Sequence, residues 1–291
     1  MIITNLVGGL GNQMFQYAFG RALSLRHGVP LKIDARDFRT YRLHRFVLQQ
    51  AFSLAADEAT AADRRAVLGW RGSLPALSVL RRNALEAWRG PRLLVQDVRE
   101  PASRYVSAAP ASCYLLGYWQ SERFFAGAAG EVRRDFRFRP QLSGANRDWA
   151  QRIADCTAVS VHVRRGDYAA NPATRALHGL CSPEYYRRAI SHVAEHAPRA
   201  QFFVFSDDLA WARASLAIPH PHHFVDGNGP EANFHDLQLM SLCRHHVIAN
   251  SSFSWWGAWL CERADKIVVA PSRWVAYTEL PEIAPPAWVR L

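Results

Sequence analysis

The sequence has no apolar run long enough to cross a membrane, since such a span needs about 20 predominantly apolar residues. Its first residues also lack the basic stretch and the long apolar core of a secretion signal, so we expect a cytoplasmic protein. No C-x-x-C pair occurs, which argues against a zinc or redox site of that kind. We expect reduced thiols at the five scattered positions Cys113, Cys156, Cys181, Cys243 and Cys261.

The chain of 291 residues carries a formal charge of +10, and its first half holds the whole excess. Residues 1–150 contain 22 Lys and Arg against 12 Asp and Glu, whereas residues 151–291 contain 13 of each. The excess is almost all arginine, scattered among apolar residues, as in a solvated basic face or a surface that meets an anionic partner. Because no nucleic-acid-binding signature accompanies it, we expect no nucleic acid partner and consider peripheral contact with the inner face of a membrane.

Strand and helix patterns alternate along the chain. An apolar segment at 2–7 is followed by a glycine-rich break at 8–12, helical periodicity at 13–27 and a second strand at 31–34. The second half repeats strand and helix several times, which predicts an α/β fold with doubly wound parallel sheets. In such sheets ligands bind where the strands end, so we look for polar residues there.

A polar, turn-rich stretch at 138–148 is the best candidate for a boundary between two domains. It predicts an N-terminal domain of residues 1–143 and a C-terminal domain of residues 144–291. Helical spacing at 59–68 and 77–88 indicates helices added to the first domain, without any recognisable chemistry.

The first candidate binding segment is the glycine-rich turn with Gly9, Gly11, Asn12 and Gln13. Glycines allow a ligand to approach the backbone, and the N-terminus of the following helix offers N–H groups to anionic oxygens. The spacing matches neither the G-x-G-x-x-G of dinucleotide binding nor a P-loop. A tight structural turn is therefore an equally good interpretation.

The second segment follows an apolar strand and contains His162, Arg164, Arg165 and Asp167. Residues 162 and 164 of a strand point to the same side, so an imidazole and a guanidinium project together from the end of the sheet. A guanidinium can bind phosphate through two parallel hydrogen bonds. The alternative is a salt bridge between one of these arginines and Asp167.

Two further segments also begin where apolar strands end. Asp207 and Asp208 could hold a divalent metal, or one of them could cap the following helix. The segment 249–257 offers hydroxyl and backbone N–H donors at a helix start, which suits a phosphate group. Trp255 and Trp256 within it favour core packing over a sugar platform.

Three motifs resemble those of the bacterial α-1,2-fucosyltransferases of glycosyltransferase family 11. They are GGLGNQMFQYA at 8–18, HVRRGDY at 162–168 and NSSFSWWGAWL at 250–260. The segment at 116–125 and the FSDD segment at 205–208 are also similar to the family, so the resemblance spans nearly the whole chain.

The resemblance implies a GT-B architecture, in which two Rossmann-like domains face each other across a cleft. It also implies transfer of L-fucose from GDP-β-L-fucose to the 2-hydroxyl of galactose or a similar sugar, with inversion and without a metal or other cofactor. The acceptor would be a surface glycan such as an O-antigen, in lipid-linked form where the basic half meets a membrane. By position, Arg164 would bind the β-phosphate, His162 the guanine or nearby backbone, and one of Asp207 and Asp208 the guanine N–H groups. The remaining nucleotide contacts would come from Asn250, Ser251, Ser252 and Phe253, with Asn12 near the transferred sugar.

The proposed reaction needs a group that accepts the proton of the acceptor hydroxyl. Asp167 and Asp34 are candidates because each follows a strand near a motif, although Asp167 could instead orient an arginine. Two other hypotheses stay open at this point: a GT-B transferase with a different nucleotide-sugar donor, and a non-catalytic nucleotide- or glycan-binding protein.

Overall fold

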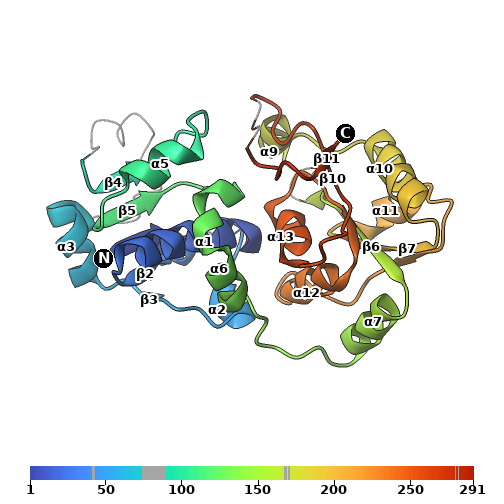
Figure 1. Ribbon diagram of the computed structural model, residues 1–291, viewed down its shortest axis with the longest axis horizontal. Coiled ribbons are helices and arrows are strands. Elements are labelled where there is room, and N and C mark those ends of the chain that lie inside the picture. Colours follow the sequence, from blue (N-terminus) through green and yellow to red (C-terminus); the bar gives the residue numbers. More distant parts are fainter. Residues whose placement is uncertain (41–42, 74–89, 167–168, 170, 279, 281) are drawn as a thin grey trace. The chain divides into compact units, whose positions relative to one another are not determined.

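The computed structural model describes residues 1–40, 43–73, 90–166, 169, 171–278, 280 and 282–291. Internal packing divides the chain into two units, Met1–Pro140 and Gln141–Leu291, each built on its own sheet (Figure 1). The division falls close to the boundary suggested by the sequence. The helix expected at 77–88 lies outside the described residues. No helix within the described ranges combines the length and apolar character of a membrane span.

The N-terminal unit contains a parallel sheet in the order β3-β2-β1-β5-β4. Its strands are β1 (Ile2–Asn5), β2 (Leu31–Asp34), β3 (Asp57–Glu58), β4 (Leu93–Val95) and β5 (Cys113–Leu116). Its helices are α1 (Leu10–His27), α2 (Leu48–Ala51), α3 (Ala61–Leu68), α5 (Ala102–Ala108) and α6 (Ala129–Asp135), with 3-10 turns η1 (Arg36–Arg39), η2 (Gly69–Ser73), η4 (Glu122–Phe124) and η5 (Ala126–Ala128). The βαβ opening predicted from the sequence is confirmed, with a shorter first strand and an earlier helix start.

Helix α1 is held in the core by a buried amide as well as by apolar packing. Gln16 is fully buried, and its Oε1 accepts a hydrogen bond from the Val7 N–H at 3.0 Å. Its Nε2 donates to the Gly117 carbonyl at 3.1 Å. The helix ends at His27 and is capped by Gly28, whose φ of 62° lies in the left-handed region that glycine tolerates best. One glutamine therefore ties the turn after β1 to the turn after β5.

The C-terminal unit contains a parallel sheet in the order β11-β10-β9-β6-β7-β8. Its strands are β6 (Thr157–Val163), β7 (Ala200–Ser206), β8 (His222–Phe224), β9 (His245–Val247), β10 (Val268–Ala270) and β11 (Val289–Arg290). Its helices are α7 (Ala145–Ala154), α9 (Pro172–His178), α10 (Pro183–His196), α11 (Leu209–Ser215), α12 (Phe234–Leu242) and α13 (Ser252–Leu260). Figure 1 shows β6 and β7 side by side within this unit.

The tryptophans of α13 pack in the core, as the sequence suggests. Trp255 and Trp256 are fully buried, with ring centroids 5.0 Å apart in an edge-on arrangement. The indole N–H of Trp255 donates to the Ile283 carbonyl at 2.7 Å, so its one polar atom is satisfied. The helix is thereby fixed, and its first turn carries the partly exposed Ser252 and Phe253.

Replacing Gln16 by Leu is expected to lower the free energy of unfolding by about 1 to 3 kcal/mol, because the Val7 N–H and the Gly117 carbonyl lose their partner. Urea denaturation followed by circular dichroism measures this difference. Gln50→Leu is the matched control, since Gln50 is exposed on α2 and its replacement should cost less than about 0.5 kcal/mol. Equal stabilities of the two variants would contradict the role given to Gln16.

Candidate functional site

The ends of β6 and β7 bring an arginine and an aspartate together. The two strands pair in register, with Val163 opposite Ser206, so the residues that follow them are neighbours. Nη1 of Arg164 lies 3.0 Å from Oδ2 of Asp207, and the Arg165 N–H donates to Oδ1 of the same carboxylate at 2.8 Å. One carboxylate thus holds both the guanidinium of Arg164 and the backbone of the loop after β6.

The second arginine and the second aspartate form a separate arrangement. The Arg165 guanidinium carbon lies 3.9 Å from the ring centroid of Trp211, a cation–π contact, and its Nε lies 3.6 Å from Oδ2 of Asp208. Asp208 caps α11 by accepting the Trp211 N–H at 3.0 Å, and its own N–H donates to Ser206 Oγ at 2.9 Å. The capping alternative predicted from the sequence therefore applies to Asp208.

The guanidinium groups beside Asp207 and Asp208 argue against a divalent metal at these two residues. Each carboxylate faces a guanidinium, and these fixed positive charges repel a divalent cation. Within the described part of the chain, the group of His, Cys, Asp and Glu side chains close enough to share an ion lies elsewhere, on α10, with His192, Glu195 and His196.

His162 is buried at the end of β6, with 5% of its surface exposed. Burial is the main cause that lowers the pKa of its imidazole to about 4; Asp207 acts in the opposite direction and Arg164 adds to the lowering. Its ring centroid lies 5.7 Å from that of Phe253, and its Nδ1 has no hydrogen-bond partner among the described residues. His162 is therefore neutral at physiological pH and can act through hydrogen bonding, not through charge.

The start of α13 combines a structural amide with a helix cap. Asn250 is 3% exposed; its Nδ2 donates to the carbonyls of His178 at 2.9 Å and Trp274 at 3.3 Å, and its Oδ1 faces the Cys181 thiol at 3.5 Å. Ser251 Oγ accepts the Phe253 N–H at 3.3 Å. These contacts show that Asn250 joins three loops.

The hydroxyl of Ser252 and the ring of Phe253 belong to the first turn of α13, where both residues are partly exposed. N–H groups at the start of a helix have no partner within the helix and favour anions. The first turn of α13 begins at the end of β9, the strand next to β6 in the sheet. It therefore lies at the same edge as Arg164.

The glycine-rich turn of the N-terminal unit is held by its own side chains. Gly8 has a φ of 83°, and a Cβ there would lie 2.6 Å from Nδ2 of Asn12. Gln13 is fully buried; its Nε2 donates to the carbonyls of Gly8 and Arg45, both at 2.9 Å, and its Oε1 accepts the Val47 N–H. Gln13 thus has a structural role in the turn.

The other residues predicted in this turn differ in exposure. Gly9 is the N-cap of α1, and Gly11 is buried within its first turn. Asn12 is partly exposed, and its Oδ1 accepts a hydrogen bond from Gln120 Nε2 at 2.7 Å. Of the four predicted residues, Asn12 has the polar side chain that reaches the surface of the unit.

Asp34 is a poor candidate for the base. It is 2% exposed, and Arg36 binds its two oxygens with Nε and Nη2 at 2.9 and 2.8 Å, while the Tyr114 hydroxyl donates to Oδ2 at 2.9 Å. Burial raises the pKa of this carboxyl, but the hydrogen bonds from Arg36 and Tyr114 outweigh it and the net shift is downward. The lone pairs of Asp34 are occupied. Asp167, the other candidate, lies outside the described residues.

Asp236 is a notable residue that the motif analysis does not single out. It stands in the first turn of α12, after the loop that leaves β8, and therefore also at the carboxyl edge of the sheet. Burial raises the pKa of its carboxyl to about 6, although Asn228 Nδ2 donates to Oδ1 at 2.7 Å. A carboxyl so perturbed at a ligand-binding edge is a candidate functional group. The sequence signal was the polar NFHD start of an otherwise apolar helix.

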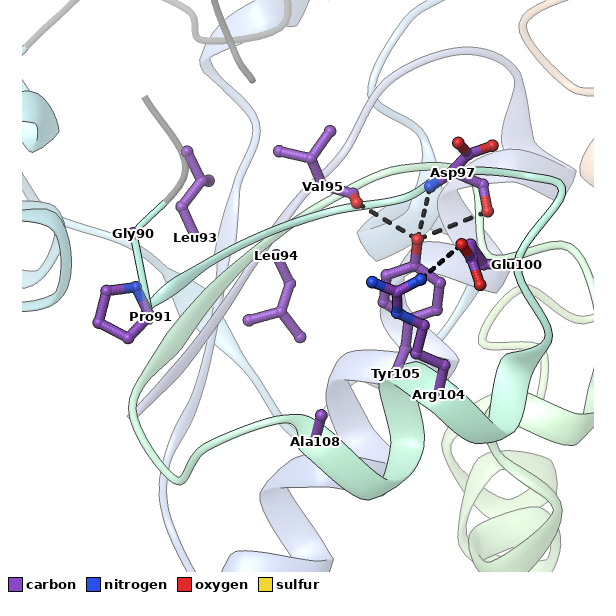
Figure 2. Close-up of a pocket in the computed structure, with 10 residues that line it drawn as sticks. All are labelled: Gly90, Pro91, Leu93, Leu94, Val95, Asp97, Glu100, Arg104, Tyr105 and Ala108. Atoms are coloured by element: carbon purple, nitrogen blue, oxygen red, sulfur yellow. Dashed lines mark hydrogen bonds and ion pairs between the residues drawn. The ribbon is translucent and has the colours of Figure 1, made fainter. Parts of the chain in front are cut away.

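A separate cavity of about 270 Å³ lies in the N-terminal unit, between β4 and α5 (Figure 2). The Tyr105 hydroxyl is bound there by the Asp97 N–H at 2.6 Å, and Arg104 pairs with Glu100 at 2.5 Å. The polar side chains Tyr105, Arg104 and Glu100 of this cavity thus have partners within its lining. None of the site residues predicted from the sequence lines it.

The fold of the chain is that of GT-B fucosyltransferases. The fucosyltransferase NodZ from Bradyrhizobium matches with a TM-score of 0.54 at 14% identity, over 88% of this chain and 91% of that one. FUT1 of Arabidopsis thaliana in complex with GDP matches with a TM-score of 0.53 at 10% identity, over 94% and 70% of the two chains. The predicted α/β class of GT-B type is confirmed.

Sequence comparison then gives the family. The family described as Glycosyl transferase family 11 matches residues 1–290, and the chain belongs to it. An alpha-1,2-colitosyltransferase of Escherichia coli is 34% identical over 100% of this chain and 99% of its own length. The O-antigen biosynthesis glycosyltransferase WbnK of the same organism is 30% identical over 98% and 99%. Galactoside alpha-(1,2)-fucosyltransferase 1 of Leontocebus fuscicollis is 26% identical over 87% and 63%.

The buried neutral state of His162 predicts a pH-dependent stability. The unfolded chain takes up this proton near pH 6.5 and the folded chain only near pH 4, so stability is full above pH 6.5 and falls as the pH drops through that window. In His162→Gln the loss between pH 7 and 4.5 should be smaller than in the wild type, by up to about 3 kcal/mol. Urea denaturation at several pH values measures it.

His196→Gln is the control for this experiment, because His196 is exposed at the end of α10. Its pH profile should follow that of the wild type. A His162→Gln profile parallel to the wild type would show that the imidazole is not held neutral in the folded state.

Proposed function

We propose that the protein is an inverting transferase that moves L-fucose from GDP-β-L-fucose to the 2-hydroxyl of a galactose in a surface polysaccharide such as an O-antigen. The observation that carries this proposal is the guanidinium of Arg164, held at a strand end beside the start of α13. Membership of family 11 and similarity to α-1,2-fucosyl- and colitosyltransferases support the sugar and the linkage.

The chemistry follows from where charge develops. As the bond between the sugar and the β-phosphate breaks, the sugar becomes oxocarbenium-like and negative charge accumulates on the departing GDP. Arg164 and the N–H groups of the first turn of α13 stabilise that charge in place of a metal ion. Because His162 is neutral, it contributes a hydrogen bond without adding to the positive charge. We propose no cofactor for this reaction.

The acceptor is the less defined half of the proposal. We propose that it is a galactose-containing glycan, including a lipid-linked one, and that the N-terminal unit meets it with its basic surface. We propose that Asn12, the partly exposed polar residue of the glycine-rich turn, lies near the transferred sugar. A cytoplasmic enzyme with peripheral attachment to the membrane would meet such an acceptor, since the charge excess of the chain lies in residues 1–150.

One comparison supports a second candidate donor, GDP-colitose. The E. coli relative that is 34% identical over the whole chain transfers colitose, a sugar that lacks the 3-hydroxyl of fucose. A site that hydrogen-bonds a hydroxyl rejects the deoxy sugar by about 10⁴-fold or more, whereas an apolar pocket discriminates by only about 10²-fold. The ratio of the two rates therefore reports the environment of that hydroxyl.

Incubation with GDP-fucose and a panel of galactosides is expected to give GDP and an α-1,2-linked product, identified by NMR. Parallel reactions with GDP-colitose, GDP-mannose and UDP-galactose test the donor. We expect GDP-fucose to give the highest kcat/KM. A strong preference for GDP-colitose would replace fucose by colitose in the proposal, and absence of turnover with every donor, despite binding of GDP, would indicate a non-catalytic protein.

Removing the guanidinium in Arg164→Ala should lower kcat by about 10² to 10³, as for loss of one preorganised donor in other enzymes. Arg164→Lys keeps the charge but loses the fork geometry and should recover only part of the rate. Arg187→Ala is the control, because Arg187 pairs with Glu184 on the exposed side of α10. EDTA should leave wild-type turnover unchanged, and full dependence on added Mn²⁺ or Mg²⁺ would contradict the metal-free mechanism.

A further inference from the structure

A side chain at Gly166 would meet the carboxylate of Asp207. A Cβ built on it would lie 2.8 Å from Oδ2 and 3.1 Å from Cγ of Asp207. Its φ is not in the left-handed region, so backbone conformation does not require glycine here. The constraint comes from the carboxylate of Asp207, which lies against the backbone of the loop that follows β6.

The same carboxylate is engaged on both oxygens. Oδ2 pairs with Nη1 of Arg164 at 3.0 Å, and Oδ1 accepts the Arg165 N–H at 2.8 Å. The side chains of Arg164 and Asp207 are 24% and 26% exposed, so the pair is partly shielded from water. A carboxylate that reads guanine turns both oxygens towards the N–H groups of the base, whereas both oxygens of Asp207 are turned towards residues of the β6 loop.

We propose that Asp207 is a positioning residue: it fixes Arg164 and the 164–166 loop for the donor diphosphate and does not read guanine. The absence of a side chain at Gly166 leaves the space that the Asp207 carboxylate occupies. This inference rests on the proposed function in one respect, the binding of diphosphate by Arg164. A guanidinium has five N–H groups in a planar fork and can bind a carboxylate and a phosphate at the same time.

The consequence of this role is a split between rate and affinity. Asp207→Asn keeps an oxygen for the Arg165 N–H but loses the ion pair, so Arg164 is held less tightly and kcat should fall by about 10- to 100-fold. Affinity for GDP should change by less than about threefold, because a negative charge near the diphosphate is removed at the same time. The preference for GDP over ADP and UDP should be retained.

The decisive experiment is a double-mutant cycle of Gly166→Ala and Asp207→Ala, with kcat for GDP-fucose turnover, GDP affinity and chemical denaturation as readouts. Gly166→Ala alone should lower kcat at least about tenfold, because the new methyl group displaces the carboxylate. In the Asp207→Ala background the same change should cost less than about threefold, since the atoms that it meets are absent. Gly229→Ala is the control, because a Cβ there meets nothing within 4 Å.

Equal losses from Gly166→Ala in both backgrounds would overturn the inference. Loss of the preference for GDP over ADP and UDP in Asp207→Asn would also overturn it and assign guanine recognition to Asp207. Failure of the wild type to bind GDP would instead contradict the proposed function. In that case, chemical denaturation still measures whether the effects of the two substitutions on the free energy of unfolding are coupled. Additive effects would show that Gly166 does not accommodate Asp207.

Discussion

The parallel register of β6 and β7 is the constraint on which the candidate site depends. Seven paired residues, ending with Val163 opposite Ser206, leave both chains at the same level of the sheet. A slip of one residue would turn the side chains that follow to the opposite face. Arg164 and Asp207 could then not meet, and the loop after β6 would lose the carboxylate that holds it. The buried apolar residues of both strands therefore fix the geometry of a charged pair that lies beyond them.

Buried side-chain amides hold the loops of the first and the last sequence motif, at 8–18 and 250–260, in place. The side-chain amides of Gln13 and Gln16 in the first motif, and Nδ2 of Asn250 in the last, form hydrogen bonds with backbone groups of neighbouring loops. Without these amides, the backbone groups would be buried without a partner. The free-energy cost of such an unpaired group exceeds the stabilisation that an ordinary hydrogen bond provides. Several residues of these motifs therefore have a structural role in holding the loops.

The sequence predicts where the strands end but not which side chains meet there. The strand ends were predictable because apolar runs stop abruptly at Arg164, Asp207 and Asn250. The partners of these side chains were not, because Arg164 pairs with a residue 43 positions away along the chain. The edge strand β8 has only three residues and two histidines, so it gave no apolar run. Asp236 was not predicted because it stands in the first turn of a helix, where acidic residues are common without any functional role.

The charges at the edge of the C-terminal sheet show how such a site can bind an anion and still release it. Arg164 and Arg165 are matched by Asp207 and Asp208, and His162 is neutral. The edge therefore offers directed N–H donors without a large net positive charge. If Arg164 binds the donor diphosphate as we propose, the diphosphate would share the guanidinium with Asp207, and the carboxylate would moderate the attraction that the guanidinium exerts. Such a balance would suit the proposed transferase, which would have to release GDP after each transfer.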